Sequence, residues 1–295
     1  MKKQIFSGSG CAIVTPFNSD GTVNERKLME LIDFQIDGGT DCIVIMGTTG
    51  EASVCCDEEH LRAIEICVGH VNGRIPVVAG CGSNDTVHAL SLSVKAQQLG
   101  ADGLLHVTPY YNKTSQRGLI RHFTAIADAV DIPIILYNVP SRTGMSIQPE
   151  TYLELSKHPN IVATKEASGD ISAICKTISL CGDDLAVYSG NDDQVVPLMS
   201  LGGLGVISVV ANIMPEVMHK MCRLYLDGDV RESAEIQLSL MSMCEAMFCD
   251  VNPIPVKEAM NQMGMEVGDV LLPLYETTDA NKNKINLALK EYELM

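Results

Sequence analysis

A lysine stands at the end of a short apolar segment near the middle of the chain. Residues 161–163 are apolar and too few for a helix, and residues 167–170 form a loop that leads to a helix N-cap, so a buried strand is predicted to end near Lys165. Burial disfavours an ammonium ion, so the pKa of this amine should fall toward the range where a nucleophilic free amine is available. The alternative is a strand end whose lysine is solvated or paired with Glu166.

Further polar residues follow other predicted strands. Thr48 and Thr49 lie in GTTGE, residues 47–51, where hydroxyls and main-chain N–H groups between two glycines suit a small carboxylate. VTPYYN and LYNVPSRTG, residues 107–112 and 136–144, add phenols that can relay protons, and Arg142 can hold a carboxylate with two hydrogen bonds. Each segment alone also fits a tight turn or a packed tyrosine. Four strand ends with such residues together favour a catalytic site.

The elements that must position these residues alternate regularly along the chain. Short apolar segments predict strands at residues 11–14, 42–46, 76–79, 103–107, 133–137, 161–164, 185–189 and 206–210. Helical periodicity and capping residues predict helices at 24–36, 57–71, 85–99, 115–130, 148–157, 171–180 and 192–201. Strands that are apolar throughout are buried on both faces, as parallel strands covered by helices are. The pattern predicts an α/β fold, a (β/α)8 TIM barrel.

After the last predicted strand the chain changes to helices alone. These are predicted at residues 215–226, 230–248, 254–264 and 278–293, with a joint at 227–229. The sequence therefore predicts a catalytic barrel over residues 1–228 and a C-terminal helical extension over residues 229–295.

Composition and charge exclude several classes of function. The 295 residues carry 37 acidic against 21 basic side chains, a formal charge of −16, which repels nucleic acid and anionic membrane surfaces. The 11 cysteines are scattered through apolar segments, and neither a secretory signal nor a membrane span is evident. We therefore expect free thiols in a reducing cytoplasm. The histidine and cysteine spacings match no metal motif, so no metal site is expected.

Five segments taken together resemble a known family. GTTGE, VTPYYN, LYNVPSRTG, ATKEASGD and SGNDD, in this order at the ends of predicted strands, closely resemble the dihydrodipicolinate synthase family of Schiff-base-forming class I pyruvate lyases. The resemblance spans the whole chain. It implies condensation of pyruvate with L-aspartate 4-semialdehyde to give 4-hydroxy-tetrahydrodipicolinate, the first committed step of the diaminopimelate and lysine pathway. It also implies that no cofactor is needed.

The resemblance also implies catalytic roles. Lys165 forms an imine with pyruvate, and Tyr137 relays protons during imine formation and aldol addition. Thr48 links Tyr137 to Tyr111, which in this family reaches the active site of the neighbouring subunit. A homo-oligomer is implied, at least a dimer, with a tetramer built as a dimer of dimers.

Substrate-binding residues follow from the same resemblance. Thr49 holds the pyruvate carboxylate, Arg142 holds the semialdehyde carboxylate, and the main chain of Gly190 and Ile207 lines the pocket. The rivals are an N-acetylneuraminate lyase or a 2-keto-3-deoxy sugar acid aldolase, which share the lysine and tyrosine but generally lack this arginine. A degenerate barrel that senses 2-keto acids without turnover is the other alternative.

Many members of this family are inhibited by lysine between subunits. The residues that match that site are Ala52, Ser53, Asp57, His60, Asn84, His88 and Tyr110. Sensitive relatives typically carry glutamate at the position of His88, where it pairs with an ammonium group of the effector. A histidine cannot replace this charge, and Asp57 lies in a helix cap. We therefore expect a degenerate effector site and little or no inhibition by lysine.

Overall fold

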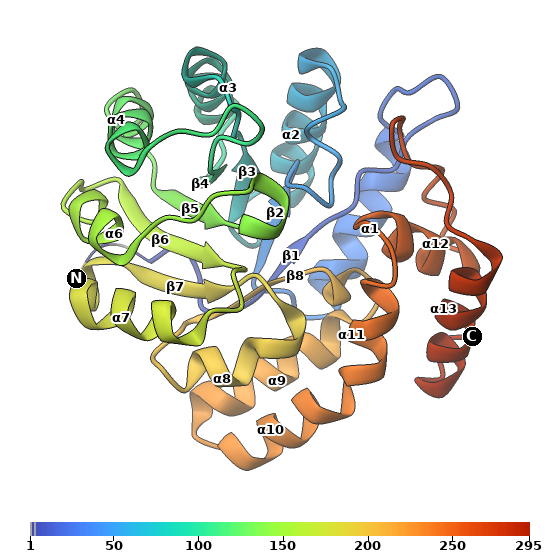
Figure 1. Ribbon diagram of the computed structural model, residues 1–295. Coiled ribbons are helices and arrows are strands. Elements are labelled where there is room, and N and C mark those ends of the chain that lie inside the picture. Colours follow the sequence, from blue (N-terminus) through green and yellow to red (C-terminus); the bar gives the residue numbers. More distant parts are fainter. Residues whose placement is uncertain (1, 3) are drawn as a thin grey trace.

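The computed structural model describes Lys2 and residues 4–295, and its centre is a closed barrel of eight parallel strands in chain order (Figure 1). The strands are β1 (Gly8–Ala12), β2 (Cys42–Ile45), β3 (Val77–Gly80), β4 (Gly103–Val107), β5 (Ile134–Asn138), β6 (Ile161–Glu166), β7 (Ala186–Ser189) and β8 (Gly205–Ser208). Pairing of β8 with β1 closes the ring. The predicted TIM barrel is therefore confirmed.

Helices cover the outside of the barrel (Figure 1). They are α1 (Glu25–Asp37), α2 (Asp57–Val71), α3 (Thr86–Gln98), α4 (Gln116–Ala127), α6 (Pro149–Leu155), α7 (Ile171–Cys181), α8 (Val195–Met199) and α9 (Pro215–Asp227). Several begin as the sequence predicts. The Asp85 side chain accepts from Val87 N, and the Asp170 side chain accepts from Ala173 N. These caps satisfy main-chain donors at the helix N-termini.

The strands are apolar throughout because both of their faces are buried. Val44, Val78 and Ile135 belong to the core inside the barrel. Ile43 and Ile45, on the opposite face of β2, pack into the core between the strands and the helices. Side chains on a strand alternate between faces, so a strand that serves two cores shows no polar alternation.

The first strand begins three residues and ends two residues earlier than predicted, at Gly8–Ala12 instead of 11–14. Its glycine-rich start gave no strand signal, because glycine is depleted in strands. Here the backbone has close neighbours: a Cβ on Gly10 would lie 2.8 Å from the Phe6 ring. Gly8 has φ +112°, which favours glycine.

Two predicted helices are interrupted. The helix predicted at 230–248 is two helices, α10 (Val230–Ser239) and α11 (Met241–Met247), joined at the buried Leu240. Apolar periodicity continues across this joint, so the sequence pattern does not reveal it. The helix predicted at 192–201 begins as a 3-10 turn, η2 (Asp192–Gln194), because Asp192 binds main-chain groups that follow β8.

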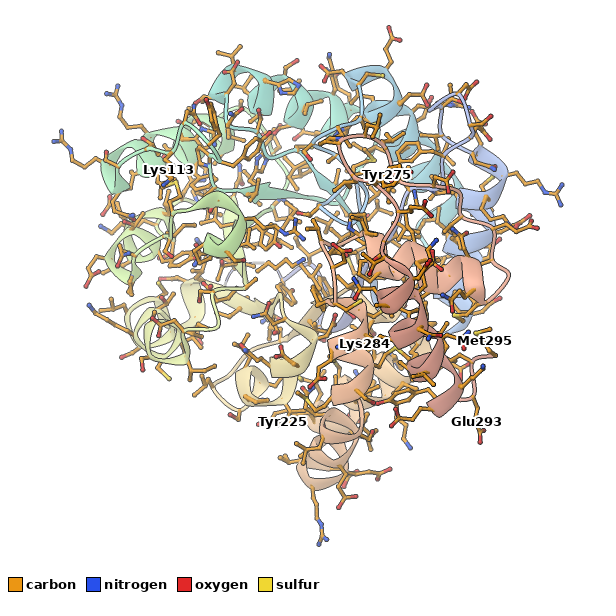
Figure 2. All side chains as sticks on the ribbon, turned by 45° about the vertical axis from the view of Figure 1, so that its right-hand side comes forward. Lys113, Tyr225, Tyr275, Lys284, Glu293 and Met295 are labelled. Carbon is orange, nitrogen blue, oxygen red and sulfur yellow. The ribbon has the colours of Figure 1, made fainter. Side chains whose placement is uncertain are left out.

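The C-terminal helices lie against one side of the barrel, and Figure 1 places α11, α12 (Ile254–Gln262) and α13 (Asp279–Glu291) together there. Turned by 45°, the same region comes forward with Tyr275, Lys284 and Met295 on it (Figure 2). The division of the chain at residue 228 stays a prediction. None of the helices in the described part of the chain has the length and apolar character needed to span a lipid bilayer.

Candidate active site

Lys165 lies inside the barrel near the end of β6, between two tyrosines. The register pairs it with Tyr137 of β5 and Tyr188 of β7. The residue is only 5% exposed, and its Nζ lies 4.5 Å from the centre of the Tyr137 ring. A Cβ on Gly190 would lie 3.1 Å from Cγ and Cε of Lys165, so glycine leaves room for the lysine stem. The structure thus brings together the two residues expected to do the chemistry.

Electrostatics favour a reactive amine at Lys165. The pKa of Lys165 is lowered from 10.5 to about 8, mainly by burial; the Asp192 carboxylate opposes this effect, and the positive charge of Arg142 adds to it. At pH 7, a pKa of about 8 leaves roughly one amine in ten unprotonated, against about one in a few thousand for an ordinary lysine. A nucleophilic amine is therefore available near neutral pH.

Tyr137 is buried beside this amine. Burial raises the pKa of its phenol, and Arg142 and a hydrogen bond with Thr48 oppose the rise. The phenol is therefore protonated at neutral pH, and it has both a hydroxyl neighbour and an amine neighbour. Such a group can pass a proton between the reacting atoms and Thr48.

A cavity of about 310 Å³ opens above Tyr137. Its lining includes Thr48 and Arg142, and also most of the predicted effector residues: Ala52, Ser53, Asp57, His60, His88 and Tyr110. Asn84 is not among the lining residues, and its carbonyl accepts from Asn112 Nδ2 at 2.9 Å. Thr48, Tyr137 and Arg142 therefore border the same cavity as most of the effector candidates, whereas Lys165 and Thr49 are not among its lining residues.

Two polar contacts fix His88 within this cavity. Its Nε2 lies 2.9 Å from Asp57 Oδ1, and its Nδ1 lies 3.2 Å from Ser83 Oγ. The neighbouring His60 places Nε2 2.8 Å from the Gly80 carbonyl oxygen, and burial lowers the pKa of His60. The Asp57 carboxylate therefore already has the His88 imidazole as its partner.

Tyr111 has a different placement from the other candidate residues. It is 91% exposed, and it is not among the residues that line the cavity. Its φ of +65° is rare for a non-glycine residue and is typical of strained functional positions. The side chain therefore extends away from the site of its own chain.

Thr49 and Arg142 are linked through a residue that the sequence did not single out. Asn252 Nδ2 donates to Thr49 Oγ1 at 3.0 Å, and the Asn252 carbonyl accepts from Arg142 Nη2 at 3.1 Å. Asn252 lies just before α12, 203 residues after Thr49. Nothing local in the sequence marks this contact. Asn252 orients two candidate binding residues from the C-terminal region.

Glu166 follows Lys165 in the sequence, but its side chain lies on the outside of the barrel and is held there by hydrogen bonds. Its Oε1 accepts from Asn138 Nδ2 at 2.9 Å and from Ser168 N at 2.9 Å, and its Oε2 accepts from Tyr152 Oη at 3.2 Å. Burial raises the pKa of this carboxyl group. The Glu166 carboxylate therefore already has hydrogen-bond partners other than Lys165. The alternative prediction, that Lys165 is solvated or paired with Glu166, is wrong.

Asp192 lies in the SGNDD segment and is also buried. Its Oδ2 accepts from Val209 N at 3.0 Å and from Val210 N at 3.1 Å, just beyond β8, which carries the buried Ile207. Its Oδ1 has no hydrogen-bond partner. Asp192 thus joins the loop after Gly190 to the end of β8, and its charge favours the ammonium form of Lys165. In the described part of the chain, no three His, Cys, Asp or Glu side chains gather as a metal site.

A buried lysine of lowered pKa near the end of the sixth strand of a (β/α)8 barrel, with a phenol against it, suits a barrel enzyme that forms a Schiff base with a carbonyl substrate. The family model described as "Dihydrodipicolinate synthetase family" matches residues 5–292. The chain belongs to the dihydrodipicolinate synthetase family.

Similar proteins support this membership over the full length. The 4-hydroxy-tetrahydrodipicolinate synthase of Thermoanaerobacter sp. (strain X514) is 56% identical over 292 residues, which are 99% of this chain and 98% of that protein. A crystal structure of dihydrodipicolinate synthase from Aquifex aeolicus has a TM-score of 0.96 and 44% identity, and the match covers 98% of this chain and 99% of that one. The chloride-inhibited enzyme of Acinetobacter baumannii, complexed with pyruvate, has a TM-score of 0.95 at 41% identity, with 99% and 100% covered.

Proposed function

We propose that this protein is a 4-hydroxy-tetrahydrodipicolinate synthase, which condenses pyruvate with L-aspartate 4-semialdehyde at the start of the diaminopimelate and lysine pathway. The observation that carries the proposal is the Lys165 amine, with its pKa lowered to about 8, lying 4.5 Å from the centre of the Tyr137 ring inside the barrel. Relatives with this name match over the full chain.

The first half of the reaction uses the buried amine. The neutral Lys165 amine attacks the pyruvate ketone, and loss of water from the adduct leaves an imine. Tyr137 donates the proton that the departing oxygen needs and recovers it through Thr48, with which it shares a hydrogen bond. Once its nitrogen is protonated, the imine draws electrons from the adjacent methyl group, so loss of a methyl proton gives a neutral enamine.

The second half joins the two substrates. The enamine carbon adds to the aldehyde carbon of the semialdehyde, whose oxygen takes up a proton. The amine of the semialdehyde then displaces Lys165 from the imine carbon, so the ring closes and the enzyme amine is released. Arg142 lines the cavity above Tyr137, where its guanidinium suits the semialdehyde carboxylate. Thr49 and the main chain of Gly190 and Ile207 hold the pyruvate moiety.

The active form is a homo-oligomer. Tyr111 extends from the surface with 91% of its area exposed in a strained conformation. An exposed tyrosine in such a conformation suits insertion into a neighbouring subunit, where it would complete the relay from Tyr137 through Thr48. A dimer is then the smallest active unit, and a dimer of dimers is the proposed assembly.

The proposed location is the cytoplasm. All 11 cysteines are free thiols, and Cys11, Cys42 and Cys67 are fully buried. Buried, unpaired thiols are typical of proteins in reducing compartments.

The test of the proposal is turnover with defined aldehydes. The purified protein is incubated with pyruvate and either L-aspartate 4-semialdehyde or N-acetylmannosamine, and products are identified by mass spectrometry. We expect the cyclic product with the semialdehyde and no condensation with the sugar. Preference for the sugar would assign the protein to the lyases that cleave N-acetylneuraminate, and no product with either would favour a 2-keto acid sensor.

A further inference from the structure

A second buried lysine lies near the active-site loop. Lys257 of α12 and Glu51 of GTTGE form an ion pair of 2.8 Å, with side chains 2% and 0% exposed. Among the ion pairs between described residues, this is the one in which both side chains are buried. A buried pair is costly to desolvate, so excellent geometry is needed to retain it. The proposed reaction uses neither residue.

The pair joins three segments that are distant in sequence. Lys257 Nζ donates to the carbonyl oxygen of Thr15 at 3.1 Å and to that of Asp269 at 2.6 Å. Glu51 Oε2 accepts from Leu271 N at 2.7 Å. Figure 1 shows the segment after α12 beside the loop that follows β1, and a Cβ on Gly268 would lie 2.5 Å from the Phe17 carbonyl oxygen. The ammonium and the carboxylate therefore fix these loops to one another.

The same pair holds the loop that carries Thr48, the candidate proton relay, and Thr49, the candidate pyruvate-binding residue. Glu51 has φ +61°, a strained value for a residue with a side chain, and its N donates to Thr48 O at 3.1 Å. Thr15 Oγ1 donates to Gly50 O at 2.9 Å from the other side. The loop thus retains the strained backbone conformation at Glu51 because hydrogen bonds and the ion pair hold it to buried partners. A shift of Glu51 moves Thr48 and Thr49 directly.

We propose that Glu51 and Lys257 are positioning residues that hold Thr49 where it binds pyruvate and Thr48 where it relays protons with Tyr137. The inference rests on the proposed function, which assigns Thr49 to the pyruvate moiety and Thr48 to the proton relay with Tyr137. Both charged side chains are buried and bind main-chain groups of the surrounding loops, so they act through the loop and not on the substrate.

The experiment compares Lys257→Met and the double variant Glu51→Gln/Lys257→Met with the wild type. Each is tested for thermal stability, for KM toward each substrate and for borohydride trapping of pyruvate. The double variant carries no unpaired buried charge, so it recovers most of the stability that Lys257→Met loses. In both variants KM for pyruvate rises at least about tenfold and trapping at subsaturating pyruvate slows. The reason is that a small displacement of a substrate-binding group strongly reduces productive binding. KM for the semialdehyde changes much less.

Ser233→Ala is the matched control for loss of stability alone. Ser233 is fully buried, and its Oγ donates to Met221 O at 2.7 Å between α9 and α10, away from the cavity. This variant is expected to melt earlier with an unchanged KM for pyruvate. A folded double variant with the wild-type KM for pyruvate would overturn the inference, as would an equal rise in KM for both substrates. Absence of trapping in the wild type would instead refute the proposed function.

Discussion

The charge of Asp192 should set the pH at which Lys165 becomes reactive. The pKa of Lys165 is lowered to about 8, mainly by burial, and this value already includes the opposing effect of the Asp192 carboxylate. Asp192→Asn removes the charge but keeps a side-chain oxygen that can accept from Val209 N and Val210 N. The ammonium form loses its favourable neighbour, so the pKa of Lys165 falls further.

The size of the pKa shift at Lys165 follows from the buried position of its amine. The change from 10.5 to about 8 corresponds to about 3 kcal/mol of preference for the neutral amine. At pH 7 this lower pKa raises the fraction of Lys165 that is a neutral amine by a factor of about a few hundred. Because the amine loses its proton as pH rises, the rate of adduct formation climbs with pH and levels off above the pKa. The wild-type midpoint is expected near pH 8.

The assay measures the initial rate of reductive trapping of pyruvate on Lys165 between pH 6 and pH 10, at one subsaturating pyruvate concentration. Asp192→Asn should shift the midpoint to lower pH. Asp193→Asn is the matched control, because it removes the same charge from the next, exposed residue. A wild-type midpoint near 10.5, or equal shifts in the two variants, would refute the reasoning.

Three further predictions concern the cavity. Tyr137→Phe should lower kcat by about a hundredfold or more while the melting temperature stays close to wild type, because a proton relay is lost; unchanged turnover would remove this residue from the mechanism. Arg142→Ala should raise KM for the semialdehyde by about ten- to a hundredfold and KM for pyruvate far less, and equal effects would indicate a role in holding the loop. Lysine should inhibit weakly or not at all in initial-rate titrations at subsaturating pyruvate, because the Asp57 carboxylate already contacts the His88 imidazole. His88→Glu should increase inhibition by lysine, and strong inhibition of the wild type would contradict this prediction.

The buried lysine and the barrel could be predicted because their signals are local. A lysine after three apolar residues marks the end of a buried strand, and the repeated apolar segments mark strands covered on both faces. The burial of Lys165 follows directly from that position. The same local signals placed Tyr137 and Arg142 at the end of the neighbouring strand.

The supporting residues could not be predicted because their partners are distant in the chain. Asn252 contacts Thr49 across 203 residues, and Lys257 contacts Glu51 across 206. Neither contact follows from periodicity or from a motif. Glu166 looked like a partner for its neighbour Lys165, but alternation along β6 turns it toward Asn138 on the outside of the barrel.

The central claim is that Lys165 forms the imine with pyruvate, and the most direct measurement is the site of the reduced adduct. The protein is incubated with pyruvate and borohydride, digested and mapped by mass spectrometry, with Lys165→Ala treated in parallel. We expect one adduct, on the peptide that contains Lys165, and none in the variant. An adduct on another lysine, including the buried Lys257, or trapping that persists in Lys165→Ala, would contradict it.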